Sequence, residues 1–126
     1  MRALEVIGST GISVTAFRKN IKKERPFKVI KLGINLSKER LYANISSRVD
    51  EMITQGLVTE VEQLHPYRNL NALQTVGYKE LFDYIDGRCS LQESIQKIKA
   101  NTKQYAKRQL TWFKKDKAIF WLNGKQ

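Results

Sequence analysis

The sequence predicts a mainly helical α/β chain in which long helices accompany two short, parallel strands. Apolar residues recur at intervals of three and four along much of residues 38–115, which is the spacing of amphipathic helices. Two runs rich in β-branched and aromatic residues, 27–36 and 118–123, are typical of strands. A long, mostly helical segment separates the two runs, and connections of this kind join parallel strands.

The first 28 residues predict a short helix followed by a basic connector. Residues 2–7 have helical spacing, and the Gly-Ser-Thr-Gly turn from Gly8 to Gly11 should end that helix. A helix that opens so abruptly suggests that the chain has been cut from something longer. Residues 12–28 are rich in Lys and Arg, which fits either an extended, solvated connector or an arm that faces phosphates.

A strand and two helices are expected next. Residues 27–36 alternate and then run apolar, and a near-continuous apolar strand is typically covered on both faces, as in a parallel sheet. Ser37 can cap a helix that carries apolar side chains as far as Ile53. Gly56 should close that helix in the left-handed conformation, and a shorter helix should follow until Pro66 ends it.

Two further helices and the closing strand complete the prediction. One helix covers about 77–86 and stops at Gly87. Ser90 and Glu93 form the Ser-x-x-Glu pattern of a capping box, which begins a long helix that reaches about Lys115. The two strands together would leave exposed hydrogen-bonding edges, so we expect further strands beside them in a longer protein.

The charge balance points to a polyanionic partner. The chain has 126 residues, with 23 Lys and Arg against 12 Asp and Glu, and a formal net charge of +11. Nucleic acid and an anionic membrane surface are the partners that such an excess attracts. A membrane span is excluded because no apolar run approaches ~20 residues.

Cysteine and histidine usage predicts a cytoplasmic protein without a metal site. Cys89 is the one cysteine, which allows no internal disulfide and is in keeping with a reducing compartment. His65 is also alone, so neither side chain can join a cluster of His and Cys ligands. The N-terminal residues contain no hydrophobic core of a secretory signal.

The densest group of cations and aromatic residues lies at 106–115, with the sequence AKRQLTWFKK. Lys99 and Lys103 precede it at helical spacing. Lys and Arg neutralise phosphates, whereas Trp and Phe either stack on bases or anchor a helix to a core. The segment fits a nucleic-acid-binding helix, and it fits equally an amphipathic helix with a solvated basic face.

Several segments, in order along nearly the whole chain, resemble one family. They are RALEV at 2–6, RVDEMITQGLVTEVEQL at 48–64, TVGYKEL at 75–81, NTKQYAKRQLTWF at 101–113 and IFWLN at 119–123. Together they resemble the C-terminal portion of bacterial tRNA dimethylallyltransferases, also called tRNA isopentenyltransferases. The most specific part is GYKEL followed at the family's spacing by AKRQLTWF.

The resemblance implies a reaction and an architecture. Members of that family transfer a dimethylallyl group from dimethylallyl diphosphate to the exocyclic amine of an adenine beside the tRNA anticodon. They are built on a P-loop nucleotide-kinase-like core with an inserted helical domain that grips the anticodon arm. Residues 1–26 would then be the end of the inserted domain and a basic linker, and residues 27–126 the C-terminal part of the core, with both strands at its edge.

Two catalytic parts of that family do not occur in these residues. The phosphate loop, Gly-x-Thr-x-x-Gly-Lys-Ser/Thr, is absent, and Gly8–Gly11 lacks its lysine, its spacing and a preceding strand. The acidic residue that activates the adenine amine belongs to an upstream segment of the family. We therefore expect no catalytic residue here, no cofactor bound by this chain alone, and no activity without the N-terminal portion of the same protein. Mg²⁺ is expected only for the intact enzyme.

The resemblance also assigns binding residues. Arg48 corresponds to an arginine that contacts the donor diphosphate, which a guanidinium can clamp through two parallel hydrogen bonds. By spacing alone, Arg48 would be an ordinary surface arginine. The remaining expected contacts are with tRNA, and they fall on Arg2, Gln74, Thr75, Gly77, Tyr78, Lys79, Lys103, Lys107, Arg108, Gln109 and Lys114.

The expected tRNA contacts differ in kind. Gly77 would let RNA approach the backbone, and Lys79 would pair with a phosphate. Tyr78 would either stack on a base or pack in the core. Gln109 could reach a base edge. The apolar side chains of the same segment are expected in the core, namely Leu110, Trp112 and Phe113.

Three hypotheses about function follow from the sequence. The preferred one is the C-terminal part of a tRNA dimethylallyltransferase. The second is a freestanding RNA-binding module that derives from such an enzyme and lacks its activity. The third is a basic helical domain that binds DNA or an acidic protein, in which case the resemblance carries no information.

Overall fold

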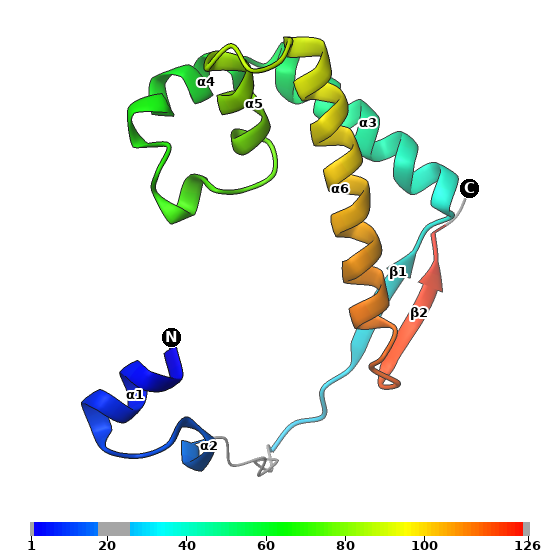
Figure 1. The fold of residues 1–126 in the computed structure, drawn as a ribbon. Coiled ribbons are helices and arrows are strands. Elements are labelled where there is room, and N and C mark those ends of the chain that lie inside the picture. Colours follow the sequence, from blue (N-terminus) through cyan, green and yellow to red (C-terminus); the bar gives the residue numbers. More distant parts are fainter. Residues whose placement is uncertain (1, 18–25, 125–126) are drawn as a thin grey trace.

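The fold is a helical body joined to a two-stranded sheet, as Figure 1 shows for the computed structural model, which describes residues 2–17 and 26–124. The strands β1 (Lys31–Asn35) and β2 (Ile119–Asn123) pair in parallel, with Gly33 opposite Trp121. Among the described residues these are the only strands. The predicted fold class, with parallel strands on either side of a helical crossover, is confirmed.

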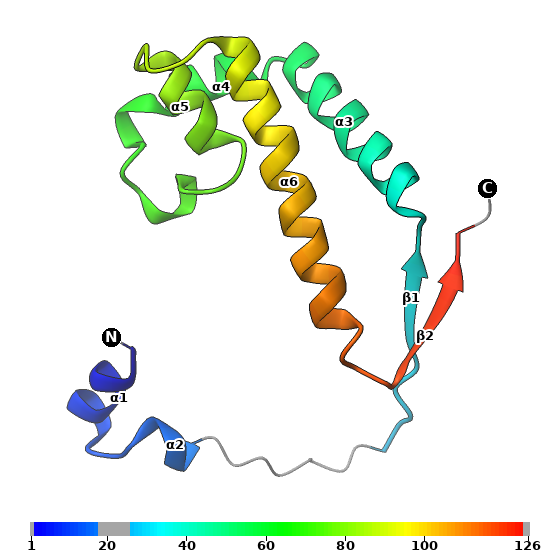
Figure 2. The ribbon, with the colours of Figure 1, turned by 45° about the vertical axis from the view of Figure 1, so that its right-hand side comes forward.

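The crossover leaves the sheet along one long helix and returns along another. The helix α3 leads away from β1, and α6 runs back beside it to β2, while α4 and α5 pack at the far end (Figure 2). The elements between the strands are α3 (Lys38–Thr54), α4 (Leu57–Leu64), the 3₁₀ turns η1 (His65–Tyr67) and η2 (Asn71–Leu73), α5 (Tyr78–Ile85) and α6 (Leu91–Phe113).

The residues that the sequence predicts at the ends of these helices are found there. The Ser37 hydroxyl accepts a hydrogen bond from the backbone N–H of Arg40 at the start of α3. At the start of α6, Glu93 Oε2 accepts from the N–H of Ser90, and the Ser90 hydroxyl accepts from the N–H of Glu93. Gly56 is left-handed, with φ +100°, between α3 and α4. Each satisfies backbone groups that a helix end would otherwise leave unpaired.

The hydrophobic core lies where α3, α4, α5 and α6 meet. Leu81 and Val61 have no exposed surface. The cluster of buried residues consists of Val49, Leu57, Val61, Leu81, Phe82 and Ile98. Each of the four helices therefore contributes at least one side chain to a common core.

None of the helices in the described part of the chain is both long and apolar enough to cross a membrane.

The N-terminal residues form a separate pair of helices. α1 (Arg2–Thr10) and α2 (Val14–Phe17) contact each other and lie apart from the helical body in Figures 1 and 2. The prediction that Gly8 ends the first helix is wrong, because the helix continues through it. The hydroxyl of Thr10 donates to the Val6 carbonyl and so supports the last turn. The turn comes at Gly11, whose φ is +67°.

The basic connector is only partly described. α2 lies within residues 12–28, where the sequence predicted no regular element. Its four residues, Val14–Phe17, span one turn, which is too short for a hydrophobic period to be visible. Residues 18–25, which carry most of the connector's cations, lie outside the described residues.

The sheet is shorter than predicted, and more of its surface is exposed. Pairing covers five residues of each strand, so residues 27–30 have no partner strand and are not part of β1. The expectation that the strand at 27–36 is covered on both faces is wrong for the described chain. One face of the sheet is largely exposed, and its side chains are Leu32, Ile34, Phe120 and Leu122. No described helix packs over that face.

The end of α6 also differs from the prediction. α6 ends at Phe113, two residues before Lys115, and its last turn extends beyond the core cluster. The Trp112 side chain is 68% exposed and that of Phe113 40%, so the core placement predicted for them is wrong. Their rings meet edge to face, with centroids 5.0 Å apart. Leu110 is half-buried.

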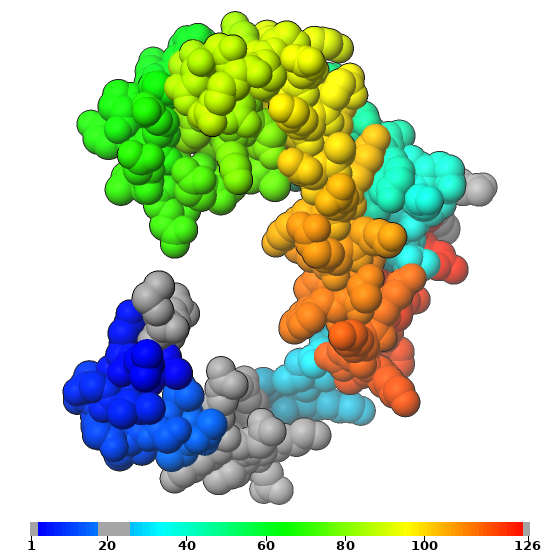
Figure 3. Space-filling model, viewed as in Figure 1, coloured from blue at the N-terminus to red at the C-terminus, as the bar shows by residue number. Residues whose placement is uncertain are grey.

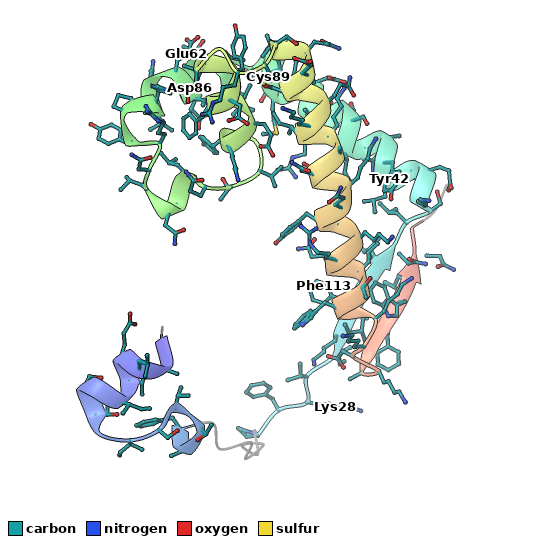
Figure 4. The ribbon with its side chains drawn as sticks, in the orientation of Figure 1. Lys28, Tyr42, Glu62, Asp86, Cys89 and Phe113 are labelled. Carbon is teal, nitrogen blue, oxygen red and sulfur yellow. The ribbon has the colours of Figure 1, made fainter. Side chains whose placement is uncertain are left out.

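An ion-pair cluster ties η1 to the end of α5 and predicts a pH dependence of stability. His65 Nε2 lies 2.7 Å from Asp86 Oδ1, and Arg88 donates to Asp86 Oδ2. Asp86 is labelled in Figure 4. Hydrogen bonding to His65, followed by that to Arg88, lowers the pKa of Asp86. A carboxylate with a lowered pKa stabilises the fold above its ordinary pKa of about 3.9, and this is lost as the pH falls through the lower folded pKa.

We therefore expect Asp86→Asn to be less stable than the wild type at neutral pH, with a difference that shrinks below about pH 4. The measurement is the urea midpoint of both proteins from pH 7 downwards. A difference that stays constant to the lowest pH at which both fold would contradict this role for Asp86.

Candidate functional site

One cavity brings together two segments that the sequence assigned to different ligands. It has a volume of about 420 Å³. Its lining includes Arg48 of α3, the loop residues Thr75, Val76 and Gly77, and Tyr105 of α6. The remaining lining residues are Ile45, Val49, Met52, Ile98 and Thr102. The cavity is therefore mostly apolar, with a guanidinium and a backbone loop at its edge.

Arg48 carries an exposed guanidinium at the cavity. Its side chain is exposed, and within the described residues it has no ion-pair or hydrogen-bond partner. Its neighbour Val49 is buried in the core cluster, which fixes the position of this turn of α3. A guanidinium that no carboxylate neutralises, next to an apolar wall, suits a ligand with a diphosphate at one end and a hydrocarbon at the other.

The loop before α5 is held by its own hydrogen bonds. Gly77 is buried, with φ +106°, a conformation that residues with a Cβ rarely adopt. The carbonyl of Thr75 accepts from the N–H of Lys79. Gln74 donates through Nε2 to the carbonyl of Arg68, at 2.6 Å. Thr75 is exposed at the cavity, whereas the side-chain amide of Gln74 is hydrogen-bonded to the preceding turn.

The side chains of Tyr78 and Lys79 lie in different environments. Tyr78 is half-buried and packs against the core cluster, and its hydroxyl donates to Glu60 of α4. This hydrogen bond is the main reason that the pKa of Tyr78 is raised. The geometry therefore favours the packing role over base stacking. Lys79 is exposed and carries an ammonium group beside the loop.

The C-terminal half of α6 carries the predicted basic surface. Lys107 and Arg108 line a surface hollow of about 680 Å³ together with exposed Trp112. The other residues around it are Gln104, Thr111 and Lys115. These last turns of α6 are orange in Figure 3 and lie at the surface of the molecule in that view. We call Lys107, Arg108, Trp112 and Lys115 the basic surface.

Two tyrosine rings contact cationic side chains near this surface. The Lys103 ammonium lies 5.4 Å from the centre of the Tyr42 ring, and that of Lys38 lies 5.6 Å away. Tyr42 lies on α3 and is labelled in Figure 4. The Arg108 guanidinium lies 5.9 Å from the Tyr105 ring. Since Tyr105 also lines the cavity, the basic surface and the cavity adjoin.

Two further predicted tRNA contacts line other hollows. Lys114 lines a second hollow of about 390 Å³, shared with Lys107 and Tyr42. Gln109 lines a third, between α6 and the sheet, so it lies on a different side of the helix from Lys107. Arg2 begins α1, and its side chain lies outside what the structure describes.

Sequence reasoning missed Tyr105 and Thr102 as lining residues of the cavity. A signal was present, because Tyr105 precedes Arg108 by three residues and therefore lies on the same side of a helix. The proximity to Arg48, which is distant in sequence, carried no local signal.

No metal centre can be built from the described residues. Nowhere in 2–17 and 26–124 do three or more His, Cys, Asp or Glu side chains come together as potential ligands. No step proposed below passes through a metal ion.

Comparison with known proteins identifies the family. The family model for IPP transferase matches residues 1–116. The chain belongs to the IPP transferase family. It is 48% identical over its whole length to tRNA dimethylallyltransferase 1 of Phocaeicola vulgatus, and 48% identical over 97% of its length to tRNA dimethylallyltransferase of Cytophaga hutchinsonii. It covers 42% and 40% of these relatives, respectively.

Solved structures of the family have the same fold. The full-length tRNA isopentenylpyrophosphate transferase of Bacillus halodurans matches 97% of this chain with a TM-score of 0.74 and 37% identity. The tRNA delta(2)-isopentenylpyrophosphate transferase of Staphylococcus epidermidis matches equally well by the same measures. The chain covers 37% and 41% of those two proteins. The family's C-terminal part is therefore the part that this chain represents.

Proposed function

We propose that this chain acts as the C-terminal part of a cytoplasmic tRNA dimethylallyltransferase. The full-length enzyme would transfer a dimethylallyl group from dimethylallyl diphosphate to the exocyclic amine of an adenine next to the anticodon. The observation that carries the proposal is the cavity that Arg48 and residues 75–77 line together. A donor site and an acceptor site must adjoin in a group-transfer enzyme, because the reacting atoms have to come within ~3–3.5 Å.

Each side of the site has its own proposed role. Arg48 would hold the donor diphosphate as it leaves. The 75–77 loop and Lys79 would contact the tRNA anticodon arm, and the basic surface would neutralise its phosphates. Mg²⁺ is proposed only as a companion of the diphosphate in the full-length enzyme, since this ion is commonly held through substrate phosphates.

Labelled donor tests this proposal. The full-length protein, given tRNA and dimethylallyl diphosphate with a labelled prenyl group, should place the label on the adenine beside the anticodon. The 126-residue chain alone should transfer none, because it lacks a phosphate loop. If the full-length protein binds tRNA and transfers no label, it is a non-catalytic RNA-binding module instead.

The basic surface gives a prediction about salt. Arg108→Ala should weaken tRNA binding by the chain and flatten the plot of log affinity against log salt by about one unit. The reason is that one fewer phosphate is neutralised, so one fewer counterion is released. Preference among tRNAs should not change. Fluorescence titrations at several salt concentrations measure both quantities.

Arg88→Ala is the matched control for this charge. Arg88 pairs with Asp83 and Asp86 at the opposite end of α6, so its loss removes the same charge away from the basic surface. The salt slope of Arg88→Ala should equal that of the wild type. If Arg108→Ala leaves affinity and slope unchanged, the basic face of α6 is only solvated.

A further inference from the structure

Glu80 is a buried carboxylate that holds the cavity loop to α6. Only 6% of the surface of Glu80 is exposed. Oε2 accepts a hydrogen bond from the backbone N–H of Gly77 at 2.8 Å, and Oε1 accepts one from Nδ2 of Asn101 at 2.7 Å. The two oxygens therefore join the loop before α5 to the middle of α6.

A second contact fixes the same turn from the main chain. The hydroxyl of Ser94, which has no exposed surface, donates to the carbonyl of Glu80 at 2.8 Å. Burying a carboxylate is costly unless its oxygens are hydrogen-bonded, and a buried network of this kind specifies one arrangement of its members. The first turn of α5 is thus fastened to α6 at two points.

The cap at the start of α5 depends on Glu80 alone. Gly77 occupies the N-cap position and has no side chain that could accept from the helix. Only the glutamate half of a capping box is present, and it binds the N–H of a residue whose φ is +106°. Without this hydrogen bond, the most permissive residue of the loop would be free to change its conformation.

The fastening points lie at the cavity itself. Gly77 lines the cavity with Thr75 and Val76, and Thr102, which follows Asn101 on α6, lines it too. We propose that Glu80, acting through Asn101, is a positioning residue that holds residues 75–77 beside Arg48 in the geometry that tRNA requires. This inference rests on the proposed function, because it names a residue that organises the acceptor side of the same site.

The chain contains its own matched control. Glu93 makes the same hydrogen bond at the start of α6, where its Oε2 accepts from the N–H of Ser90 at 2.8 Å. That cap lies outside the cavity lining. Both glutamates cap a helix, so their removal tests a general loss of stability, and only the loss of Glu80 should disturb the cavity loop.

The experiment compares the variants Glu80→Ala and Glu93→Ala in the full-length enzyme. Glu80→Ala should lower kcat/KM for tRNA by about 10- to 100-fold, since small misplacements of positioning groups have effects of this size. The loss should lie mainly in KM for tRNA, with KM for the donor unchanged. Glu93→Ala should lower the melting temperature without changing either KM.

A swapped pair keeps the test decisive if Glu80→Ala does not fold. Asn101→Asp alone sets two carboxylates against each other and should lose tRNA binding. The double variant E80Q/N101D restores a donor and an acceptor between the two positions and leaves a carbonyl for the Gly77 N–H, so tRNA binding should return close to the wild-type value.

The outcomes separate the two proposals. A wild-type enzyme that transfers no dimethylallyl group refutes the proposed function. A wild-type enzyme that is active, while Glu80→Ala behaves like Glu93→Ala, overturns the positioning role of Glu80. A folded E80Q/N101D variant that fails to recover tRNA binding overturns it as well.

Discussion

In the full-length enzyme, Arg48→Ala should lower the rate of dimethylallyl transfer by roughly 30- to 1000-fold and leave tRNA affinity almost unchanged. Negative charge grows on the diphosphate as the carbon–oxygen bond breaks, so a cation that holds it binds the transition state more tightly than the substrate. Arg48 is exposed at the cavity, without a partner among the described residues, so its loss should not unfold the protein.

Steady-state kinetics with the donor varied at saturating tRNA measure this effect, and a separate binding assay measures tRNA affinity. Arg48→Lys should recover only part of the rate, because an ammonium cannot reproduce the two parallel hydrogen bonds of a guanidinium. Arg108→Ala provides the opposite pattern, with weaker tRNA binding and normal donor kinetics. If Arg48→Ala shows that pattern instead, Arg48 contacts tRNA and not the donor.

The long helices were predictable because their signals are local. Ser37 and Ser90 begin α3 and α6 as expected, and Gly56 ends α3 in the left-handed conformation. Each of these effects depends on residues within one helical turn. The parallel strands were predictable for a different reason, since the length and helical character of the crossover between them leave little other choice.

The lengths and coverage of the elements were not predictable, because they depend on contacts between distant residues. Residues 27–30 have the composition of a strand and no partner for pairing. Trp112 has the spacing of a core residue, but α6 extends beyond the core before it reaches that turn. Hydrophobic periodicity gives the direction of a side chain on its helix and does not say whether anything packs there.

The residues of the candidate site were predictable in part, but their arrangement was not. The resemblance to the family named Arg48 and the tRNA-contacting segments, but no pattern placed Arg48 beside residues 75–77 or brought Tyr105 into the same cavity. Nor did the sequence indicate the role of Glu80, because its partner Asn101 is on another helix. Cavities form between elements, so their lining is a property of the packing.

The packing of that core predicts the largest effect on stability. Leu81 has no exposed surface and lies in the cluster with Val61 of α4 and Ile98 of α6. Leu81→Ala should lower the free energy of unfolding by ~2–5 kcal/mol, which combines the lost burial of the removed atoms with the cavity that remains. A domain is typically stable by only about 5–15 kcal/mol, so this variant should be close to unfolding.

Urea denaturation at constant pH measures the change, and Leu4→Ala is the matched control. Leu4 is a leucine in a helix, but its side chain is 74% exposed on α1, so its removal should change the free energy of unfolding by less than about 0.5 kcal/mol. Leu81→Met keeps most of the volume and should cost less than about 1.5 kcal/mol. Equal urea midpoints for Leu81→Ala and Leu4→Ala would mean that α5 does not depend on this core. Since Gly77 is the N-cap of α5, the loop beside Arg48 would then owe its position to the hydrogen bonds of Glu80 and not to the apolar packing beneath it.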